Sequence, residues 1–486
     1  MFTKTTPLAW LGLTALFLSL SPSVLAQNED FSLSRFSEYE HKIPTVDLSK
    51  STGTEDVLDQ AFDDAFAGST VKGMTAALVT SEGTVWERAA GLSEEFPADA
   101  TLTIDHLHGI ASNTKSYVAA TVLLMAEDGL LDIDDSMDMY LEPIENTDGS
   151  VTIAQLLGMR SGFSDYLNDN PDWVPYLFDE EGTIWEIEDL LSLFMLEPNF
   201  DVDQDWGYSN SNYLLAALIM ESITGNPWHE EVRNRVLDPL GLTETFVYPF
   251  EEPTNEQALS HVWGGNEDGE FVDLTEVIDI PSFFSIATSA GCIISTAEDL
   301  AKFRVGLHGG QLLEAASYEE MKQAYSPAGI GIDYGLGIYS DNYFAEENWG
   351  HDGSWGYLSL SRYFPECDYA LVVIQNEPRT QGVGNNYVNA FLDLKETYDI
   401  CECGLVSTDE ISPVEIDLYP NPSSGVLNVQ VDALEVELRV IDLLGNTVIG
   451  NLKAGSNSLE MLSNGTYLVV GVVDGEIVRE KVLVEK

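Results

Sequence analysis

Two side chains that could act as a nucleophile and its base stand three residues apart, Ser112 and Lys115, in "HGIASNTKSYVAATVLLMAEDGL". Apolar residues then recur at helical spacing, and Gly129 can end a helix, so we expect a helix near residues 112–128. Residues three apart share a helix face, so Lys115 can lie beside the Ser112 hydroxyl. The lysine can take the hydroxyl proton only if burial or a neighbouring group lowers its pKa.

The same pair has a structural interpretation, in which Ser112 caps the helix and Lys115 is a solvated side chain. A second Ser-x-x-Lys pair, Ser69 and Lys72, shows that the spacing alone is weak. That pair leads into a strand pattern, which would point the two side chains apart. Only the pair at Ser112 begins a helical pattern.

A Tyr-x-Asn motif, Tyr208 and Asn210, immediately precedes an apolar helical pattern near residues 210–224. A tyrosine beside a lysine can hold or relay a proton, and an asparagine offers a donor and an acceptor to a substrate amide. The structural alternative is a packed tyrosine with an asparagine cap. Two further copies begin at Tyr166, in a loop pattern, and at Tyr387, in a presumed closing helix.

A third motif, His351-Asp352-Gly353-Ser354, precedes an alternating strand pattern. We expect His351 to titrate near neutral pH and to donate to a substrate, and Gly353 to let a ligand approach closely. The Ser354 N–H could then pair with the Ser112 N–H as an oxyanion hole. The alternative is a hairpin turn with His351 exposed. Another His-x-Gly, beginning at His308, follows a helical pattern and resembles a glycine-rich helix end.

The order of elements predicts an α+β fold. "MTAALVTSEGTVWERAAG" predicts two strands, a helix-rich stretch follows, and strands return at "YGLGIYS", "GYLSLSRYF" and "YALVVIQN". Strands at both ends favour one antiparallel sheet, flanked by helices and accompanied by a helical lobe. After Cys403 a polar linker, 404–414, leads to short strand patterns over 415–486, which predict a small all-β domain.

Residues 1–26 have the pattern of a signal peptide: Lys4, an apolar core, and small residues before a cleavage point after Ala26. The catalytic region would then span 27–403 of the exported chain. Export permits disulfides, and we expect Cys367 to pair with Cys401 or Cys403. A further cysteine, Cys292, has the pattern of a small buried residue.

The charge is strongly acidic: 21 Lys and Arg against 82 Asp and Glu, a formal net charge of −61. Such a chain repels nucleic acid and anionic membranes, so we expect neither as a partner. The acids are spread out and no calcium-loop motif occurs, which favours solvation over cation binding. Neither a metal nor an organic cofactor is expected, because HExxH, P-loop and dinucleotide motifs are missing from the sequence.

The order of the well-placed motifs, Ser-x-x-Lys, Tyr-x-Asn and His-x-Gly, resembles that of the serine penicillin-recognising hydrolases. These include class C β-lactamases, DD-carboxypeptidases, D-aminopeptidases and related esterases. The resemblance covers about residues 40–400 and extends to "TIAQLLGMRSGFSDY" and "TSAGCIISTAEDLAKF". It implies a β-lactamase/transpeptidase-like fold in which Ser112 is acylated, Lys115 and Tyr208 share proton transfer, and Asn210 holds the substrate.

Three departures from the family pattern concern the substrate (His351), the packing without loss of catalysis (Met159) and the pocket wall (167–205). His351 stands where β-lactamases have the lysine of Lys-Thr-Gly, which favours the carboxypeptidase, aminopeptidase or esterase branches. Met159 replaces a frequent histidine, and 167–205 lacks the usual Pro-Gly. Substrate carboxylates need a cation, for which Arg160 and Arg362 are the candidates by position in the sequence.

The tail resembles the C-terminal sorting domains of type IX secretion. "LYPNPSSGVLNV", "NGTYLV" and "KVLVEK" follow in that module's order. The resemblance implies contact with the type IX machinery and passage through the periplasm to the medium or the cell surface. The alternative is an ordinary adhesion or sugar-binding β-sandwich.

Together the motifs predict an exported serine hydrolase that cleaves amide or ester bonds through an acyl-enzyme on Ser112. A DD-carboxypeptidase, a D-aminopeptidase and an esterase all remain open. The alternatives are a β-lactamase and a non-catalytic binding or sensor protein with the same fold. The chain has no Gly-x-Ser-x-Gly motif, which argues against an α/β-hydrolase.

Overall fold

The computed structural model describes residues 54–69, 71–94, 100–179, 183–258, 261–263, 271–273, 279–324, 332–341, 346–377, 390–395 and 397, and most of 417–486. The predicted signal peptide, the linker 404–414, Cys401 and Cys403 lie outside the described residues. Contacts divide the chain between Asp399 and Ile400 into two units, each considered by itself.

The first unit is built on an antiparallel sheet in the order β3-β2-β1-β13-β12-β11-β10-β9. Its strands are β1 (Gly73–Thr80), β2 (Gly83–Glu94), β3 (Ala100–Thr101), β9 (Ile332–Tyr334), β10 (Tyr339–Asp341), β11 (Trp349–Ser354), β12 (Leu358–Phe364) and β13 (Tyr369–Gln375). The β1 and β13 strands pair from Met74↔Gln375 to Thr80↔Tyr369. Segments from both ends of the unit therefore meet in one sheet, as the sequence predicted.

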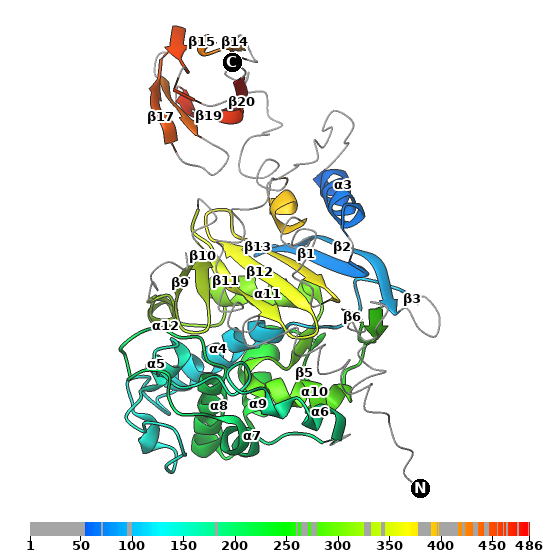
Figure 1. Cartoon of the computed structure of the whole chain (residues 1–486), viewed down its shortest axis with the longest axis vertical. Coiled ribbons are helices and arrows are strands. Elements are labelled where there is room, and N and C mark those ends of the chain that lie inside the picture. The colour runs from blue at the N-terminus through cyan, green and yellow to red at the C-terminus, as the bar shows by residue number, and fades with distance from the viewer. Residues whose placement is uncertain are drawn as a thin grey trace. The chain divides into compact units, whose positions relative to one another are not determined.

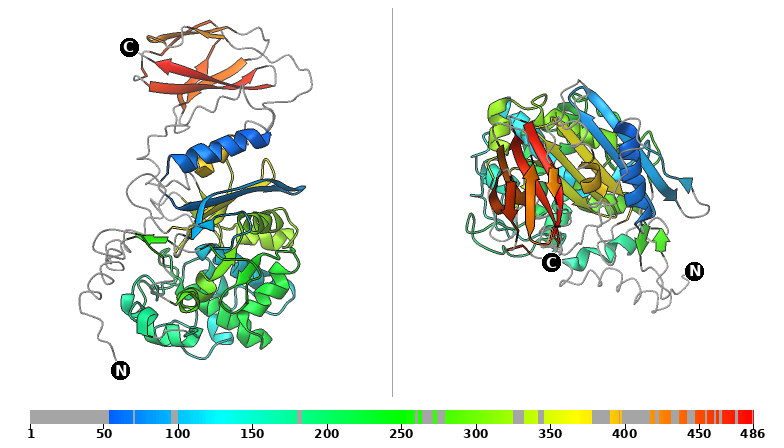
Figure 2. Two further views of the ribbon diagram at one scale, coloured as in Figure 1. Left: turned by 90° about the vertical axis from the view of Figure 1, so that its right-hand side faces the viewer. Right: turned by 90° about the horizontal axis from the view of Figure 1, so that it is seen from above.

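Helices cover both faces of this sheet (Figures 1 and 2). On one face α3 (Thr54–Ala67) and the helical residues 390–395 share a core with β1, β12 and β13, through side chains such as Phe62 and Phe391. On the other face α11 (Ala297–His308) packs against the same strands. Both β12 and β13 are buried along their whole length; β13 is accordingly a nearly continuous apolar run, whereas β12 also buries Ser359, Ser361 and Arg362.

The helical lobe surrounds two central helices, α4 (Thr114–Glu127) and α8 (Ser211–Thr224), which confirms the two main helix predictions. Both helices are buried on almost every side, which requires apolar residues all round. Around them lie α5 (Ile153–Leu157), α6 (Tyr176–Asp179), α7 (Ile187–Phe194), α9 (Trp228–Val232), α10 (Ile280–Ala287) and α12 (Ala315–Met321). Short strands complete the lobe: β4 (His108–Gly109), β5 (Thr245–Val247), β6 (His261–Trp263), β7 (Phe271–Asp273) and β8 (Ile293–Ser295).

The run "YGLGIYS" departs from the prediction, because it contains a turn between β9 and β10 instead of one strand. Gly337 has φ +70°, and a Cβ there would lie 2.7 Å from the Ala119 Cβ. The turn therefore packs directly on the helix α4, which glycine alone permits. The apolar residues alternate straight through this turn, so the sequence pattern alone predicted a single strand.

The second unit is all-β, as predicted. One sheet orders β14 (Asp417–Tyr419), β15 (Val426–Gln430) and β18 (Gly455–Ser458). The other orders β17 (Thr447–Leu452), β16 (Val436–Ile441), β19 (Gly465–Val473) and β20 (Glu476–Val484). Side chains from both sheets, among them Leu427, Val429 and Val469, form one apolar core. This unit therefore has its own core.

Two cysteines can be described. Cys367 is disulfide-bonded, in line with its predicted pairing, although both predicted partners lie outside the described residues. Cys292 is a buried free thiol in the core of the helical lobe. Within the part of the chain that the structure describes, none of the helices has the length and apolar character needed to cross a membrane.

Candidate active site

Ser112 lies in a short 3₁₀ helix, η3 (Ala111–Asn113), which leads directly into α4. Its hydroxyl oxygen accepts a hydrogen bond from Lys115 Nζ at 3.1 Å and another from the Tyr208 hydroxyl at 2.9 Å. The Ser-x-x-Lys and Tyr-x-Asn motifs therefore converge on one oxygen atom, as the sequence predicted. Ser112 itself is partly exposed, so a substrate can reach it.

The backbone just before the nucleophile is held in a rare conformation. Ala111 has φ +49°, in the left-handed region that a residue with a Cβ seldom adopts. The residue is almost fully buried and is the first residue of η3, two positions after the end of β4. A sharp turn of this kind turns the chain from the sheet into the helix and presents the next side chain, Ser112, outward. Strain of this sort persists only where the surrounding structure enforces it.

Lys115 is completely buried, so the interpretation of a solvated lysine is wrong. Besides Ser112, its Nζ donates to Asn210 Oδ1 and to the Ala290 carbonyl, each at 2.7 Å. Burial lowers the pKa of Lys115 to about 7, and the charge of Asp165 acts in the opposite direction. Near neutral pH a large fraction of the amine is therefore neutral and can accept the proton of Ser112.

Tyr208 lies on the segment that enters α8 and donates its hydroxyl hydrogen to Ser112. Burial raises the pKa of this phenol well above its usual value. The phenol is therefore a proton donor at neutral pH, and Lys115 is the better base of the two.

Met159 holds the backbone on either side of Tyr208. Its carbonyl accepts from the Gly207 N–H at 3.0 Å, and its sulfur lies 3.3 Å from the Ser209 N–H, so it holds the residues on both sides of Tyr208. Met159 is fully buried and has φ +60°. The methionine thus anchors this segment at the position where the family often has histidine.

Asn210 is held at both ends of its amide group. While Oδ1 accepts from Lys115, Nδ2 donates to both oxygens of Asp165, at 2.9 and 3.1 Å. Asp165 is a buried carboxylate that sequence reasoning missed, although it lies in the quoted stretch "SGFSDY". In this arrangement the Asn210 side chain contacts the protein rather than facing outward to a substrate.

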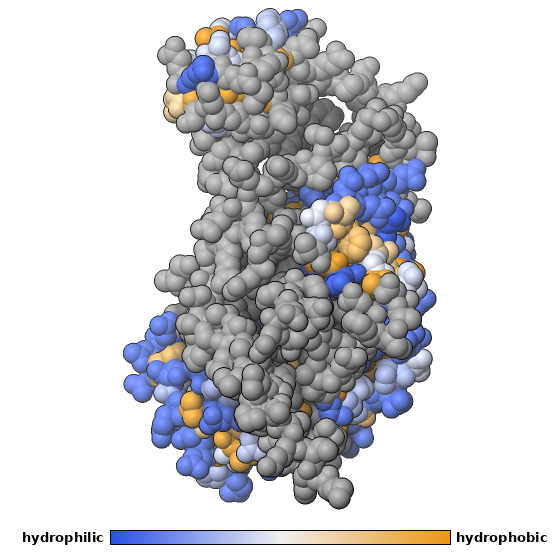
Figure 3. All heavy atoms as spheres, turned by 45° about the vertical axis from the view of Figure 1, so that its right-hand side comes forward, coloured by the Kyte–Doolittle hydropathy of each residue, from blue (hydrophilic) through white to orange (hydrophobic). Residues whose placement is uncertain are grey.

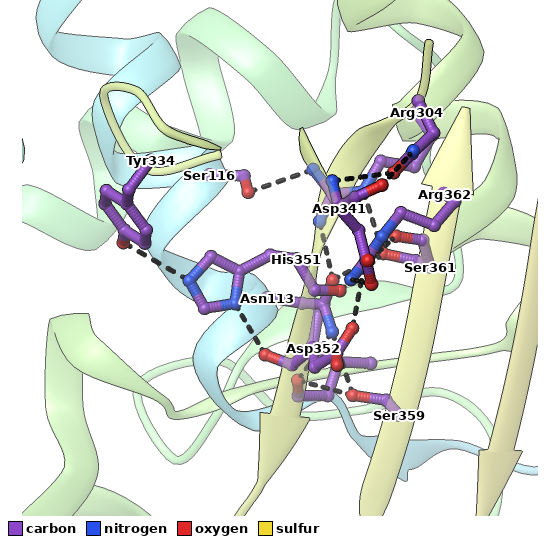
Figure 4. Close-up of polar contacts among 12 residues, drawn as sticks. Asn113, Ser116, Arg304, Tyr334, Asp341, His351, Asp352, Ser359, Ser361 and Arg362 are labelled. Atoms are coloured by element: carbon purple, nitrogen blue, oxygen red, sulfur yellow. Dashed lines mark hydrogen bonds and ion pairs between the residues drawn. The ribbon is translucent and has the colours of Figure 1, made fainter. Parts of the chain in front are cut away.

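His351 lies on β11 and is buried, not exposed. Its Nδ1 is 2.6 Å from the Asp352 carbonyl oxygen, which can only accept, so Nδ1 carries the hydrogen. Nε2 is then the acceptor for the Tyr334 hydroxyl at 3.3 Å (Figure 4). Burial, reinforced by Lys115, holds the pKa of His351 well below its usual value. The expectation of a histidine that titrates near neutral pH is therefore wrong.

Gly353 is required for a different reason from the one expected. A Cβ at this position would lie 2.1 Å from the Ile110 carbonyl oxygen and 2.4 Å from Ser359 Oγ. The glycine therefore lets β11 press against the backbone that leads to Ser112, instead of making room for a ligand. Ser354, the next residue, is exposed at the end of β11.

A buried polar network joins this strand to η3 and α4 (Figure 4). Arg304, on α11, donates to Ser361 and Ser116, each at 2.9 Å, and to Asn113 Oδ1 at 2.5 Å. Ser361 in turn donates to the His351 carbonyl at 3.1 Å. Burial lowers the pKa of Arg304 to about 9, and the groups that accept its hydrogen bonds are two hydroxyls and an amide oxygen. Arg304 therefore connects α4, β12 and β11.

Neither arginine proposed as a carboxylate ligand is free. Arg160 forms an ion pair with Asp203 at 2.7 Å, and the fully buried Arg362 forms one with Asp352 at the same distance. Among the described residues, no group of three or more His, Cys, Asp or Glu side chains could hold a metal ion. His308 ends α11 and is followed by Gly309 and Gly310, as the sequence predicted.

Comparison with known proteins agrees with this geometry. The β-lactamase family matches residues 58–393, and the secretion system C-terminal sorting domain matches 417–485. Penicillin-binding protein 4* of Bacillus subtilis is 26% identical over 288 residues, which cover 57% of this chain and 62% of that protein. The chain thus spans less than two thirds of the first curated relatives that it matches.

Two solved structures are similar over most of the first unit. A D-stereospecific amidohydrolase from Streptomyces sp. is 26% identical, with a TM-score of 0.57 over 73% of this chain and 99% of its own. The D-amino acid amidase of Ochrobactrum anthropi SV3, complexed with L-phenylalanine amide, is also 26% identical, with a TM-score of 0.59 over 71% and 98%. The chain belongs to the β-lactamase family of serine hydrolases and carries a C-terminal sorting domain that indicates export.

Proposed function

We propose that this protein is an exported serine hydrolase that cleaves amide or ester bonds through an acyl-enzyme on Ser112. The observation that carries the proposal is the double hydrogen bond to Ser112 Oγ, from a buried lysine and a buried phenol. A serine hydroxyl is a weak nucleophile until a base removes its proton. Lys115, with a pKa of about 7, is suited to that role near neutral pH.

The proposed reaction has two halves. Ser112 Oγ attacks the substrate carbonyl carbon while its proton passes to Lys115 Nζ, and the carbonyl oxygen becomes an oxyanion. The N–H groups of Ser112 and Ser354 would stabilise that oxyanion, since η3 and β11 pack together. As the intermediate collapses, the leaving group takes a proton through the Tyr208 hydroxyl, which Lys115 replenishes. Water then attacks the ester, and the same groups release the acid and restore Ser112.

We further propose that the substrate carries no carboxylate that the enzyme must recognise. The cationic side chains described near Ser112 are already bound: Arg304 in the polar network, Arg362 by Asp352, and Arg160 by Asp203. His351 is neutral and engaged at both nitrogens. This charge pattern favours amidase or esterase substrates over the C-terminal carboxylate of a DD-carboxypeptidase substrate. The amide-cleaving neighbours at 26% identity support the same direction.

The sorting domain supports a second part of the proposal, transit through the periplasm and across the outer membrane by type IX secretion. After this transit the protein would be secreted or attached to the cell surface. The strongly acidic chain, with a net charge of −61, suits an extracellular protein that must stay dispersed.

Turnover of several acyl donors tests the proposal. We expect p-nitrophenyl acetate and D-phenylalanine amide to be hydrolysed faster than nitrocefin or a D-Ala-D-Ala peptide, and Ser112→Ala to lose at least about a thousandfold in kcat. Faster turnover of nitrocefin would make the protein a β-lactamase. No turnover of any donor, with tight binding of one of them, would favour a non-catalytic binding protein.

A further inference from the structure

A chain of three buried side chains runs away from the nucleophile: Lys115, Asn210 and Asp165. Their exposed fractions are 0%, 5% and 3%. Asn210 bridges the other two, since its Oδ1 accepts from Lys115 at 2.7 Å and its Nδ2 donates to Asp165 at 2.9 Å. We propose that Asp165, acting through the Asn210 amide, is the positioning residue that sets the orientation of Asn210 and the charge state of Lys115.

The orientation follows from the chemistry of the two groups. An ionised carboxylate only accepts hydrogen bonds, and an amide has a donating end and an accepting end. Asp165 must therefore face the amide nitrogen, which turns the carbonyl oxygen of Asn210 toward Lys115. Without the carboxylate, a flipped amide would point N–H groups at an ammonium that also donates. Asp165 thus determines that Lys115 has an acceptor there.

Asp165 is itself rigidly held. Its carboxylate accepts from the backbone N–H of Leu167 at 3.0 Å and of Asn168 at 3.3 Å, and from the Asn168 side chain at 2.6 Å. Its own N–H donates to the Asp169 carboxylate at 2.8 Å. Burial raises the pKa of Asp165, whereas the hydrogen bonds from Leu167, Asn168 and Asn210 oppose that shift by favouring the charged carboxylate.

The electrostatic consequence concerns the lysine. Burial favours the neutral amine, whereas the negative charge of Asp165 favours the ammonium, and the balance leaves the pKa of Lys115 at about 7. Removing the Asp165 charge would leave burial unopposed and lower the pKa of Lys115 further. The neutral base would then persist to lower pH, although the ammonium formed during the reaction would be less stable.

The other titratable groups around this pair hold one protonation state across the neutral range. Burial raises the pKa of the phenols and the thiol well above their usual values and lowers that of the histidine; these groups are Tyr208, Tyr213, Tyr334, Cys292 and His351. Asp169 is the other carboxylate in contact with the turn. A change of activity near pH 7 therefore reports on Lys115 and Asp165.

The test is the pH dependence of kcat/KM for p-nitrophenyl acetate in the full-length protein. The wild type should lose activity as the pH falls through about 7, because Lys115 becomes protonated. In Asp165→Asn we expect this acidic limb to move down by about one unit, which at pH 6 raises the activity relative to the plateau about fivefold. A lower plateau is also expected, since the proton acceptor is weaker.

Asp169→Asn is the matched control, because it removes an equal charge from the same turn without touching Asn210. The acidic limb of its kcat/KM profile should stay within about 0.3 pH unit of the wild type, because Asp169 contacts the turn rather than the Asn210 amide. If Asp165→Asn does not fold, Asn210→Ser replaces it; losing the Oδ1 acceptor should move the limb the same way. An acidic limb that stays in place or moves upward in the folded variant would overturn the inference.

This inference rests on the proposed hydrolase function, and the two can fail separately. If the wild type does not turn over the ester and is not acylated by it, the proposed function fails. If the wild type is active but the acidic limb of the pH profile stays in place in Asp165→Asn, Asp165 has a purely structural role in its turn. The proposed function then stands.

Discussion

In the proposed reaction, Lys115 and Tyr208 divide the proton transfers according to their surroundings. Both are close to Ser112, and burial favours the neutral form of each, which lowers the pKa of the lysine amine and raises the pKa of the tyrosine phenol. At neutral pH the first is therefore a base and the second a donor. This division predicts that loss of Tyr208 affects the leaving group more than the attack.

Tyr208→Phe tests this division. The variant keeps the ring but loses the hydroxyl, and we expect kcat to fall about 10²–10⁴-fold for an amide, whose amine must be protonated to leave. For a p-nitrophenyl ester the loss should be much smaller, because that phenolate leaves without a proton. Tyr140→Phe, which removes a hydroxyl bonded to Asp135 in a surface turn, is the control. Equal losses for both substrates would contradict the role of proton donor.

The sequence identified the residues that touch Ser112 but not those that support them. Ser112, Lys115 and Tyr208 could be found because each motif precedes a helix with a clear apolar period. Asp165 and Arg304 could not, because their partners lie 45 and 191 residues away and no local spacing encodes such contacts. The state of His351 was predicted wrongly because its burial depends on neighbouring strands.

At the level of elements, α11 and β12 determine where the catalytic helix lies. Arg304 binds Asn113 and Ser116, the residues next to Ser112 and Lys115, while Ser361 extends the network to β11. Gly353 lets β11 lie directly against η3. One antiparallel sheet with strands from both ends of the unit was predictable from the sequence, but this close packing was not, because it depends on a single glycine and a buried arginine.

Arg304→Met tests the network. The change removes three hydrogen bonds and leaves buried acceptors without partners, so we expect the free energy of unfolding to fall by about 2–4 kcal/mol. The kcat should fall as well, since Ser112 and Lys115 lose their support. Lys302→Ala lies on the same helix and removes a partly exposed ion pair with Glu298, worth less than about 1 kcal/mol. Urea unfolding gives the free energy of unfolding of both variants. Equal values for Arg304→Met and Lys302→Ala would show that the Arg304 network is dispensable for stability.

At the scale of the whole molecule, the β-lactamase family match and the sorting-domain match belong to separate units. All residues around Ser112 lie in the first unit, and the second unit has its own core. On the face that Figure 3 shows, hydrophilic residues predominate over the described surface, and hydrophobic ones are scattered. The all-β character of the second unit was predictable from its short, punctuated strands, whereas the pairing of those strands in two sheets was not.

A chain ending at residue 410 tests this division of labour. Such a chain keeps every cysteine and all the residues around Ser112. We expect its kcat/KM to lie within about twofold of the full chain, since the described residues around Ser112 all remain and belong to a unit with its own core. In a host with type IX secretion, the full chain should reach the medium or the cell surface and the shortened chain should remain in the periplasm. A shortened chain that is exported normally would contradict the assignment of the tail.

The central claim, that Ser112 forms the acyl-enzyme, is tested most directly by the mass of the protein after brief reaction with an activated ester at pH 7.5. We predict one added acyl group, located on Ser112 by peptide mapping, and none in Ser112→Ala. Lys115→Met should acylate at least about a hundredfold more slowly. An acyl group that maps to another residue, or that persists in Ser112→Ala, would contradict the account.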